Sequence, residues 1–245
     1  MQQLTLLAHW LTQAKYSLVF TGAGMSTESG IPDFRSAKNG LWQKFNPDEL
    51  ANVQAIWRNT EEFIAFYQAR LKDIRQYHPH AGHQVLAQWQ QENQIKTVIT
   101  QNVDGFHTQA GNTDVIELHG SFNALHCHDC QAPHTVDDFL QGQSQCRCGG
   151  IIRPNIILFG EMLPELAFAQ AQHHTQQADL FIVLGSSLSV SPANSFPRLA
   201  KQQGAKLVII NQDPTELDYL ADLCITDIRI KDALITLNQL IKKGA

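Results

Sequence analysis

The stretch from Glu117 to Cys130 contains three histidines and two cysteines, residue types that bind metals and take part in catalysis. Cys127 and Cys130 form a C-x-x-C pair. After fifteen intervening residues come Cys146 and Cys148, with one residue between them. In a reducing compartment, clustered cysteines bind metal more often than they form disulfides. Four thiolates complete a tetrahedral shell around zinc and leave no position for water, so we predict one structural zinc ion on these four cysteines.

Two of the three histidines, His126 and His128, lie beside these cysteines and are alternative zinc ligands. Because four cysteines already complete the shell, we expect neither histidine to bind the metal, and we expect His128 to point toward solvent. The fifth cysteine, Cys224, lies in the apolar run LCITDI and is predicted to be a small buried residue.

His119 directly follows the apolar run DVIEL, and Gly120 beside it leaves room for the backbone. A neutral imidazole, with an ordinary pKa of ~6.5, accepts a proton from a hydroxyl group near neutral pH. His119 is therefore a predicted general base. A purely structural histidine is the alternative interpretation, and His107 is a competing base.

Gln101, Asn102 and Asp104 follow the apolar run KTVIT in the same way. In open α/β sheets, ligands bind at the carboxyl ends of the parallel strands, so these side chains are predicted to line a ligand pocket. The alternative is a polar turn in which Asn and Asp bond to the neighbouring backbone.

Gly22 and Gly24 come directly after the run YSLVF, and Arg35 lies further along the polar loop that they open. Glycines at this place let backbone amides approach a pyrophosphate, and an arginine pairs with phosphate. A third glycine in step is missing, as is a second strand with an acidic end about twenty residues on. The pattern favours dinucleotide binding over hydride transfer by an ordinary dehydrogenase, with a simple tight turn as the alternative.

The elements that must position these residues alternate along the chain. Six short apolar runs are predicted to be buried parallel strands, over residues 16–20, 96–100, 114–118, 180–185, 206–211 and 223–228. Stretches of helical length lie between most of them, over 79–94, 164–178 and 191–203, and apolar spacing predicts a helix over 2–14. The fold class predicted is α/β, with a Rossmann-like doubly wound parallel sheet.

Two interruptions do not fit a simple wound sheet. Residues 37–79 are rich in aromatic residues and contain helical apolar spacing, and residues 121–152 contain the four clustered cysteines. We predict a Rossmann-like dinucleotide-binding domain built from 1–36, 80–120 and 153–245. The helical insertion 37–79 and the zinc-binding insertion 121–152 are predicted to form a smaller lobe.

Composition restricts the partners. The 245 residues are 43% hydrophobic and 17% charged, with a formal net charge of −5. These values are ordinary for a soluble globular protein and give no electrostatic basis for binding nucleic acid or an anionic membrane. The first residues lack a basic leader and no apolar run is long enough to span a membrane, so we expect a cytoplasmic location.

Four motifs, GAGMSTESGIPDFRS, TQNVDGFH, ELHGS and GSSLSVSPA, occur in an order that resembles the sirtuins, the NAD-dependent protein deacylases, of bacterial type. The segments RPNIILFGEMLPE and INQDPT extend the resemblance from Gly22 to Thr215. The resemblance implies that NAD is a co-substrate and that the substrate is an acyl-lysine protein or peptide. The implied products are free lysine, nicotinamide and O-acyl-ADP-ribose.

The resemblance also implies roles for individual residues. His119 is implied as the catalytic base, and Asn102 and Asp104 as catalytic residues that line the nicotinamide-ribose pocket. The implied NAD contacts are Gly22, Ala23, Gly24, Phe34, Arg35, Gln101, Asn102, Asp104, Gly185, Ser186, Ser187, Asn211, Gln212 and Asp213. The peptide is expected to lie as an added β-strand between Ile157–Glu161 and Ser187–Ser191. The implied substrate contacts are Tyr67, Arg70, Ile157, Phe159, Gly160, Glu161 and Val190.

Tyr67 and Arg70 are three residues apart and share one helix face. In a subset of sirtuins a Tyr-x-x-Arg pair binds the carboxylate of succinyl-lysine, and a hydroxyl with a guanidinium fork suits that group. The glycine-loop sequence GIPDFRS is closer to other branches, because Asp33 stands where the succinyl branch more usually has Thr. The alternative is a solvated arginine beside a core tyrosine, so the sequence predicts a deacetylase and leaves desuccinylation open.

Two other functions remain as alternatives. Protein mono-ADP-ribosyl transfer occurs within the same family, and a non-catalytic NAD-sensing or protein-binding module would need the same pocket.

Overall fold

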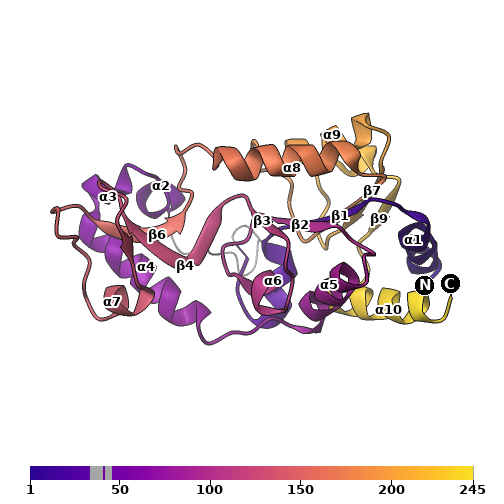
Figure 1. The fold of residues 1–245 in the computed structure, drawn as a ribbon, viewed down its shortest axis with the longest axis horizontal. Helices are drawn as coiled ribbons and strands as arrows, with labels where there is room; N and C mark the ends of the chain where they lie inside the picture. The colour runs from indigo at the N-terminus through magenta and orange to yellow at the C-terminus, as the bar shows by residue number, and fades with distance from the viewer. Residues whose placement is uncertain (34–40, 42–45, 245) are drawn as a thin grey trace.

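The computed structural model describes residues 1–33, 41 and 46–244 (Figure 1). Six parallel strands form one sheet in the order β3-β2-β1-β7-β8-β9. The bounds are β1 Ser17–Thr21, β2 Thr97–Thr100, β3 Val115–Glu117, β7 Leu180–Leu184, β8 Lys206–Ile210 and β9 Leu223–Ile225. From the central pair β1 and β7 the chain winds outward in both directions, so the predicted doubly wound α/β sheet is confirmed.

Helices cover both faces of this sheet, which is why its central strands are buried along their whole length. Below the sheet in Figure 1 lie α1 (Gln2–Gln13), α5 (Ala81–Gln91) and α10 (Ile230–Lys242), and above it lie α8 (Glu165–Gln177) and α9 (Ser195–Gln202). Successive side chains of β1 point to opposite faces. Val19 packs with α1, α5 and α10, whereas Leu18 and Phe20 pack with α8 and α9.

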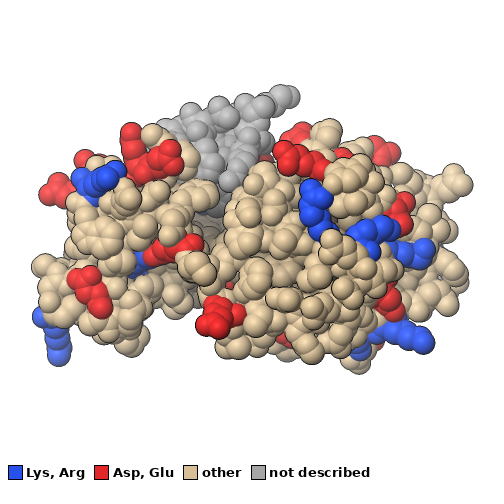
Figure 2. Space-filling model, turned by 90° about the horizontal axis from the view of Figure 1, so that it is seen from above, with Lys and Arg blue, Asp and Glu red and all other residues tan. Residues whose placement is uncertain are grey.

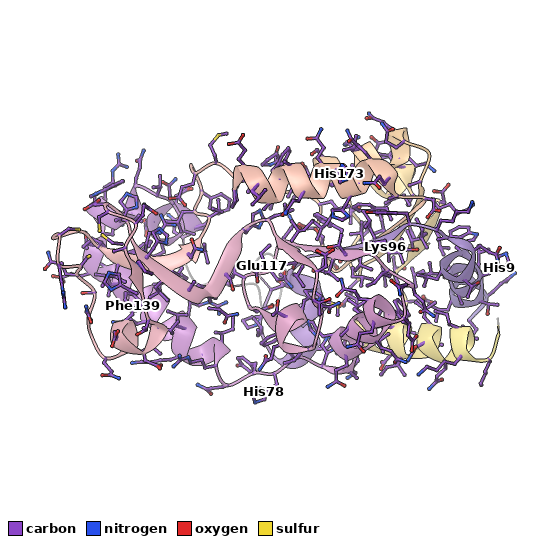
Figure 3. The ribbon with its side chains drawn as sticks, in the orientation of Figure 1. His9, His78, Lys96, Glu117, Phe139 and His173 are labelled. Atoms are coloured by element: carbon purple, nitrogen blue, oxygen red, sulfur yellow. The ribbon has the colours of Figure 1, made fainter. Side chains whose placement is uncertain are left out.

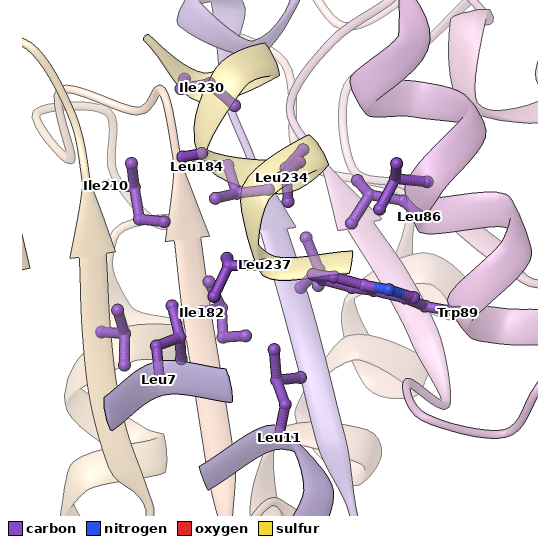
Figure 4. Close-up of a cluster of buried hydrophobic side chains, with 14 of the residues drawn as sticks. Leu7, Leu11, Leu86, Trp89, Ile182, Leu184, Ile210, Ile230, Leu234 and Leu237 are labelled. Carbon is purple, nitrogen blue, oxygen red and sulfur yellow. The ribbon is translucent and has the colours of Figure 1, made fainter. Parts of the chain in front are cut away.

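Figure 4 shows how the lower helices share one apolar core. Side chains from three helices converge on the sheet there: Leu7 and Leu11 of α1, Leu86 and Trp89 of α5, and Leu234 and Leu237 of α10. Burying one such side chain stabilises the fold by about 1.5–3 kcal/mol relative to leaving it exposed. The packing fixes α5 and α10 against each other at one edge of the functional site.

A smaller part of the molecule lies at the left of Figure 1. Its antiparallel sheet has the order β5-β4-β6, with β4 Gly120–Cys127, β5 Pro133–His134 and β6 Ile152–Ile156. Helices α2 (Pro47–Leu50), α3 (Ala55–Arg58), α4 (Thr60–Ile74) and α7 (Val136–Leu140) accompany it. A separate apolar cluster joins α4 to this sheet, through Phe63 and Leu71 on the helix and Phe122 on β4.

The sequence-based predictions miss several local features. The strand predicted over 223–228 ends at Ile225, and the polar segment after Gly22 forms a 3-10 helix, η1 (Ala23–Ser29), instead of an open loop. Cys224 is half-buried, with its Sγ 3.8 Å from the carbonyl of Asp218, so the prediction of a buried residue is wrong.

On the face shown in Figure 2, Lys and Arg side chains are interspersed with Asp and Glu. Within the described residues, no helix has both the length and the apolar character needed to cross a membrane.

Candidate functional site

The loops that follow the central strands β1 and β7 pack backbone against backbone. The Gly22 amide donates to the Leu184 carbonyl at 3.0 Å, and the Gly24 amide donates to the Gly185 carbonyl at 2.8 Å. A Cβ on Gly22 would lie 2.7 Å from the Gly185 carbonyl oxygen, and Gly185 itself has φ +63°. The glycines are therefore required first by the close approach of the two loops, whatever ligand binds there.

The η1 helix brings a serine to the pocket at the end of β2. The Ser26 hydroxyl donates to Asp104 Oδ2 at 2.6 Å, and the side-chain Nδ2 of Asn102 donates to Ser26 Oγ at 3.2 Å. The Phe106 amide donates to Asp104 Oδ1 at 2.9 Å. Burial raises the pKa of Asp104, although both of its hydrogen bonds act in the opposite direction. Asn102 and Asp104 are predictable from the sequence, whereas Ser26 comes beside them only in the folded chain.

His119 follows the edge strand β3, at the junction between the six-stranded sheet and the smaller part, where Figure 3 labels Glu117. Its Nδ1 lies 3.0 Å from the Gln101 carbonyl oxygen. A carbonyl only accepts, so Nδ1 carries the proton of the neutral ring and the lone pair is on Nε2. The ring is thus held in the tautomer in which Nε2 is the proton acceptor.

Gln101 connects this histidine to the carboxyl ends of β1 and β7, the two central strands of the sheet. Its backbone carbonyl accepts from His119, and its side-chain Oε1 accepts from the Ser186 hydroxyl at 2.6 Å. The Gln101 amide in turn donates to the Thr21 carbonyl at 2.9 Å. The ends of β1, β2, β3 and β7 are therefore joined through one residue.

The competing base, His107, lies in the core instead. It is buried, and its Nε2 is 2.9 Å from Thr21 Oγ1. Its ring centroid is 5.1 Å from that of His83, which is also buried. Burial lowers the pKa of His107 to about 3. The structure therefore places His107 on α6 (Phe106–Gln109), in the core against α5, and not beside Asn102 and Asp104 in the pocket.

A small pocket is lined by residues from the segment after β1, from α4 and from the segment after β2. It is lined by Ala23, Ser26, Ile31, Pro32, Arg70, Ile74, Asn102, Val103 and Asp104. Arg70 is only 9% exposed, its Nη1 lies 3.7 Å from Asp73 Oδ2, and burial lowers its pKa. Tyr67 is one turn earlier on α4 and outside this lining, with its ring 4.6 Å from that of Phe63. The structure thus brings Arg70, but not Tyr67, to the pocket of Asn102 and Asp104.

The remaining predicted NAD contacts lie at the carboxyl ends of β7 and β8, which are neighbours in the sheet. Ser186 is buried and Ser187 is exposed. The side-chain Nδ2 of Asn211 donates to the Asp213 carbonyl at 2.7 Å. Gln212 is exposed beside them. The other two predicted contacts, Phe34 and Arg35, lie outside the described residues.

The predicted peptide-binding segment Ile157–Glu161 connects the two parts of the molecule. The Ile157 amide donates to the His119 carbonyl at 2.9 Å, and the Phe159 amide donates to the Ala51 carbonyl at 2.8 Å. The Phe159 carbonyl accepts from Val53 at 3.0 Å. Both backbone groups of Phe159 are thus engaged by the chain itself. Gly160 follows with φ +92°. The other predicted peptide-binding segment, Ser187–Ser191, contains Val190, which is half-buried.

Glu161 ends this segment and is held by an arginine. Arg153 Nη1 and Nη2 donate to its carboxylate at 2.5 and 2.9 Å, and the Leu158 amide donates at 2.7 Å. Burial alone would raise the pKa of Glu161, but these bonds hold it below its usual range. Arg153 is only 2% exposed. Its ion pair with Glu161 therefore fixes the turn that ends the segment Ile157–Glu161.

The four clustered cysteines converge in the smaller part. Their sulfur atoms all lie within 4.8 Å of one another, with Cys127 and Cys148 3.5 Å apart and Cys130 and Cys146 3.8 Å apart. A tetrahedral site with Zn–S bonds of ~2.3 Å has sulfur atoms ~3.8 Å apart, so the cluster fits the predicted structural zinc.

The histidines of this region behave differently from one another. His128 is half-buried, and its ring centroid is 4.8 Å from that of Trp57, which is 60% exposed. The prediction that His128 points to solvent is therefore wrong. His126 is half-buried opposite Arg153 on the neighbouring strand, and burial and Arg153 lower its pKa.

Comparison with known proteins places this geometry in a family. Residues 22–192 match the model of the Sir2 family. The chain belongs to the Sir2 family. It is similar to the NAD-dependent protein deacetylase 1 of Geobacillus kaustophilus, with 52% identity over 95% of this chain and 96% of the relative. The NAD-dependent protein deacetylase of Halalkalibacterium halodurans is 54% identical over 91% of this chain and 93% of the relative.

Solved Sir2 structures share the fold over almost the whole chain. A Sir2 complex with a p53 peptide and NAD⁺ has a TM-score of 0.87 at 34% identity, covering 98% of this chain and 97% of that one. A Sir2 variant with a deacetylated p53 peptide and 3′-O-acetyl ADP-ribose has a TM-score of 0.90 at 34% identity, covering 99% and 98%. The two-part architecture of this Sir2 chain is thus that of proteins crystallised with both a peptide and an NAD-derived ligand.

Proposed function

We propose that this Sir2 chain is an NAD-dependent protein-lysine deacylase that releases nicotinamide and O-acyl-ADP-ribose. The observation that carries the proposal is the orientation of His119, whose Nδ1 is anchored on the Gln101 carbonyl at the same sheet edge as Asn102 and Asp104. The relatives named as NAD-dependent deacetylases, and a deacylase of Archaeoglobus fulgidus at 41% identity over 88% of this chain and 87% of the relative, support the same class.

NAD supplies an electrophilic ribose carbon and nicotinamide as the leaving group, and the acyl-lysine supplies the attacking acyl oxygen. Asn102 and Asp104, ordered by Ser26, line the nicotinamide-ribose pocket. His119 Nε2 would accept the proton of a ribose hydroxyl, which attacks the acyl carbon. Addition of one water to that carbon then releases the lysine amine and leaves O-acyl-ADP-ribose. The remaining NAD contacts are proposed at the ends of β1, β7 and β8: Gly22, Ala23, Gly24, Gln101, Gly185, Ser186, Ser187, Asn211, Gln212 and Asp213.

The peptide is proposed to lie between the Rossmann-like part (1–36, 80–120 and 153–245) and the smaller lobe (37–79 and 121–152). Its backbone would add to the segments Ile157–Glu161 and Ser187–Ser191. Since both backbone groups of Phe159 are already bonded to residues 51–53, the peptide would use other groups of these segments. Four thiolates would hold zinc in a closed shell, which stabilises the lobe and takes no part in the reaction.

The preferred acyl group is proposed to be acetyl, with succinyl as a second class bound through Arg70. Arg70 supports the second class because it lines the pocket of Asn102 and Asp104. Its ion pair with Asp73 and the burial of Tyr67 among aromatic rings make a weaker clamp than two open side chains would. A panel of acetyl- and succinyl-lysine peptides against wild type, Tyr67→Phe and Arg70→Met tests this. Selective loss of desuccinylation supports it, and equal rates on both peptides in all three proteins refute it.

The main proposal is tested with labelled NAD and an acetyl-lysine peptide. Nicotinamide release that requires the peptide, and that His119→Ala abolishes, is the expected result. His9→Ala is the matched control, because His9 is an exposed histidine far from the site at the right of Figure 3. Label transferred to protein would indicate an ADP-ribosyltransferase instead. NAD binding without any nicotinamide release would indicate a non-catalytic NAD-sensing module.

A further inference from the structure

The η1 helix, which brings Ala23 and Ser26 to the pocket, is attached to a neighbouring helix by one histidine. His80 Nε2 lies 2.7 Å from the Met25 carbonyl oxygen, in the middle of η1. His80 Nδ1 accepts the Gly82 amide at 2.9 Å and thereby caps the N-terminus of α5. A carbonyl only accepts and an amide only donates, so both bonds form together in one state alone, the neutral ring protonated on Nε2.

The end of η1 is attached to α10 in a similar way. Glu28 Oε2 accepts the Lys231 amide at 2.8 Å in the first turn of α10, and Lys231 Nζ lies 3.6 Å from Glu28 Oε1. Since α5 and α10 pack on each other in the core of Figure 4, they form one rigid support for η1. Within that support, His80 is the contact that reaches the Met25 carbonyl, one residue from Ser26.

We propose that His80 is a positioning residue for NAD binding: its neutral ring, held by the Gly82 amide, fixes η1 on α5, and protonation of Nδ1 breaks the bond to Gly82 that orients this ring. The inference rests on the proposed NAD-dependent function. A protonated ring would direct an N–H at the Gly82 amide, so the α5 cap would be lost. It would also place a positive charge at a helix N-terminus, where cations are disfavoured.

The charges around His80 decide when protonation occurs. Glu28 on η1 and the bond to the Met25 carbonyl favour the charged ring, and Lys231 on α10 opposes it. His83 on α5 and His107 on α6 also lie close to His80, but burial lowers the pKa of both, so they stay neutral. Burial is the largest effect and lowers the pKa of His80 below its ordinary value. Both bonds of the ring are therefore present at neutral pH, and acid conditions remove the one to the Gly82 amide.

The test compares NAD dissociation constants, measured by calorimetry on the full zinc-loaded chain, for wild type, His80→Asn and His80→Ala at pH 7.5 and 5.5. Asparagine accepts the Gly82 amide as a helix cap but does not titrate and is too short to reach the Met25 carbonyl. We expect His80→Asn to keep the melting temperature of wild type and to raise the NAD dissociation constant at pH 7.5 about three- to tenfold, the value of one hydrogen bond. His80→Ala should lower both affinity and melting temperature.

Acidification provides the second readout. Between pH 7.5 and 5.5 the dissociation constant of wild type should rise by a larger factor than that of His80→Asn. The control is His78→Asn, because His78 is exposed and points away from the molecule in Figure 3. Unchanged NAD affinity in His80→Asn at pH 7.5, or equal pH factors in both proteins, would overturn the inference and leave His80 as a simple cap. If wild type binds no NAD, the proposed function itself fails, and the inference fails with it.

Discussion

Acid should destabilise this protein through His83, a buried histidine of α5 whose ring contacts Phe106 and His107 of α6. Its side chain is 0% exposed, and neither ring nitrogen has a hydrogen-bond partner among the described residues. Burial, together with the neighbouring His107 and His80, lowers the pKa of His83 to about 2. The folded state therefore keeps this ring neutral over the whole range in which the protein is handled.

The sign and size follow from proton linkage. The unfolded chain protonates this histidine below its ordinary pKa of ~6.5, whereas the folded chain does not. The contribution to stability is complete above pH 6.5 and decreases as the pH falls toward 2. The slope approaches about 1.4 kcal/mol per pH unit, so at pH 5.0 the loss from His83 alone is about 2 kcal/mol.

The variant His83→Leu removes this titration. Urea unfolding followed by circular dichroism at pH 7.5, 6.5, 5.5 and 5.0 gives the free energy of unfolding. This free energy should fall less steeply with decreasing pH in the variant than in wild type, and the difference in slope should correspond to close to one bound proton. His173→Leu serves as the control, since His173 is exposed on α8 (Figure 3) and should leave the slope of wild type unchanged. Parallel pH profiles for wild type and His83→Leu would refute the reasoning, because they would mean that the folded protein protonates His83 as readily as the unfolded chain.

Three further predictions concern the rest of the scaffold. Cys146→Ser should lower bound zinc, measured colorimetrically, and lower the melting temperature, because the closed four-sulfur shell loses a ligand. Glu161→Leu should cost about 3 kcal/mol in urea unfolding by leaving Arg153 buried without its partner, and adding Arg153→Met should recover much of it. Gly185→Ala should lower the melting temperature far more than Gly204→Ala, because both have positive φ but only Gly185 meets another loop's backbone. Equal effects at the two glycines would contradict the packing argument.

The elements of the main sheet could be predicted because their signal is local. Strands buried on both faces are continuous apolar runs, so 180–185 and 206–211 were placed within one residue of β7 and β8. The zinc cysteines were predictable for the same reason, since both pairs have short spacing. The 3-10 helix after Gly22 was missed because its sequence is polar and lacks helical periodicity, and burial at the site stabilises it.

The positioning contacts could not be predicted because they join distant segments. His80 and Met25 are 55 residues apart in sequence, Ser26 and Asp104 are 78 apart, and Glu28 and Lys231 are 203 apart. No spacing rule applies at such separations, and only the sheet order brings these residues together. The sequence named the groups proposed to react, whereas the groups that orient them became visible only in the folded chain.

The junction at His119 shows why the active site and the zinc module must fold together. Strand β4 begins at Gly120, directly after the proposed base, and ends at Cys127, one of the four cysteines proposed to bind zinc. Its partner β6 pairs Ile152 with Cys127, and the chain beyond β6 returns to donate from the Ile157 amide to the His119 carbonyl. His119 is therefore held from both sides: its ring by Gln101 of the main sheet, and its backbone by the strand pair that the cysteines close. A zinc ion on these cysteines would thereby help to set the position of the proposed base without touching a reacting atom.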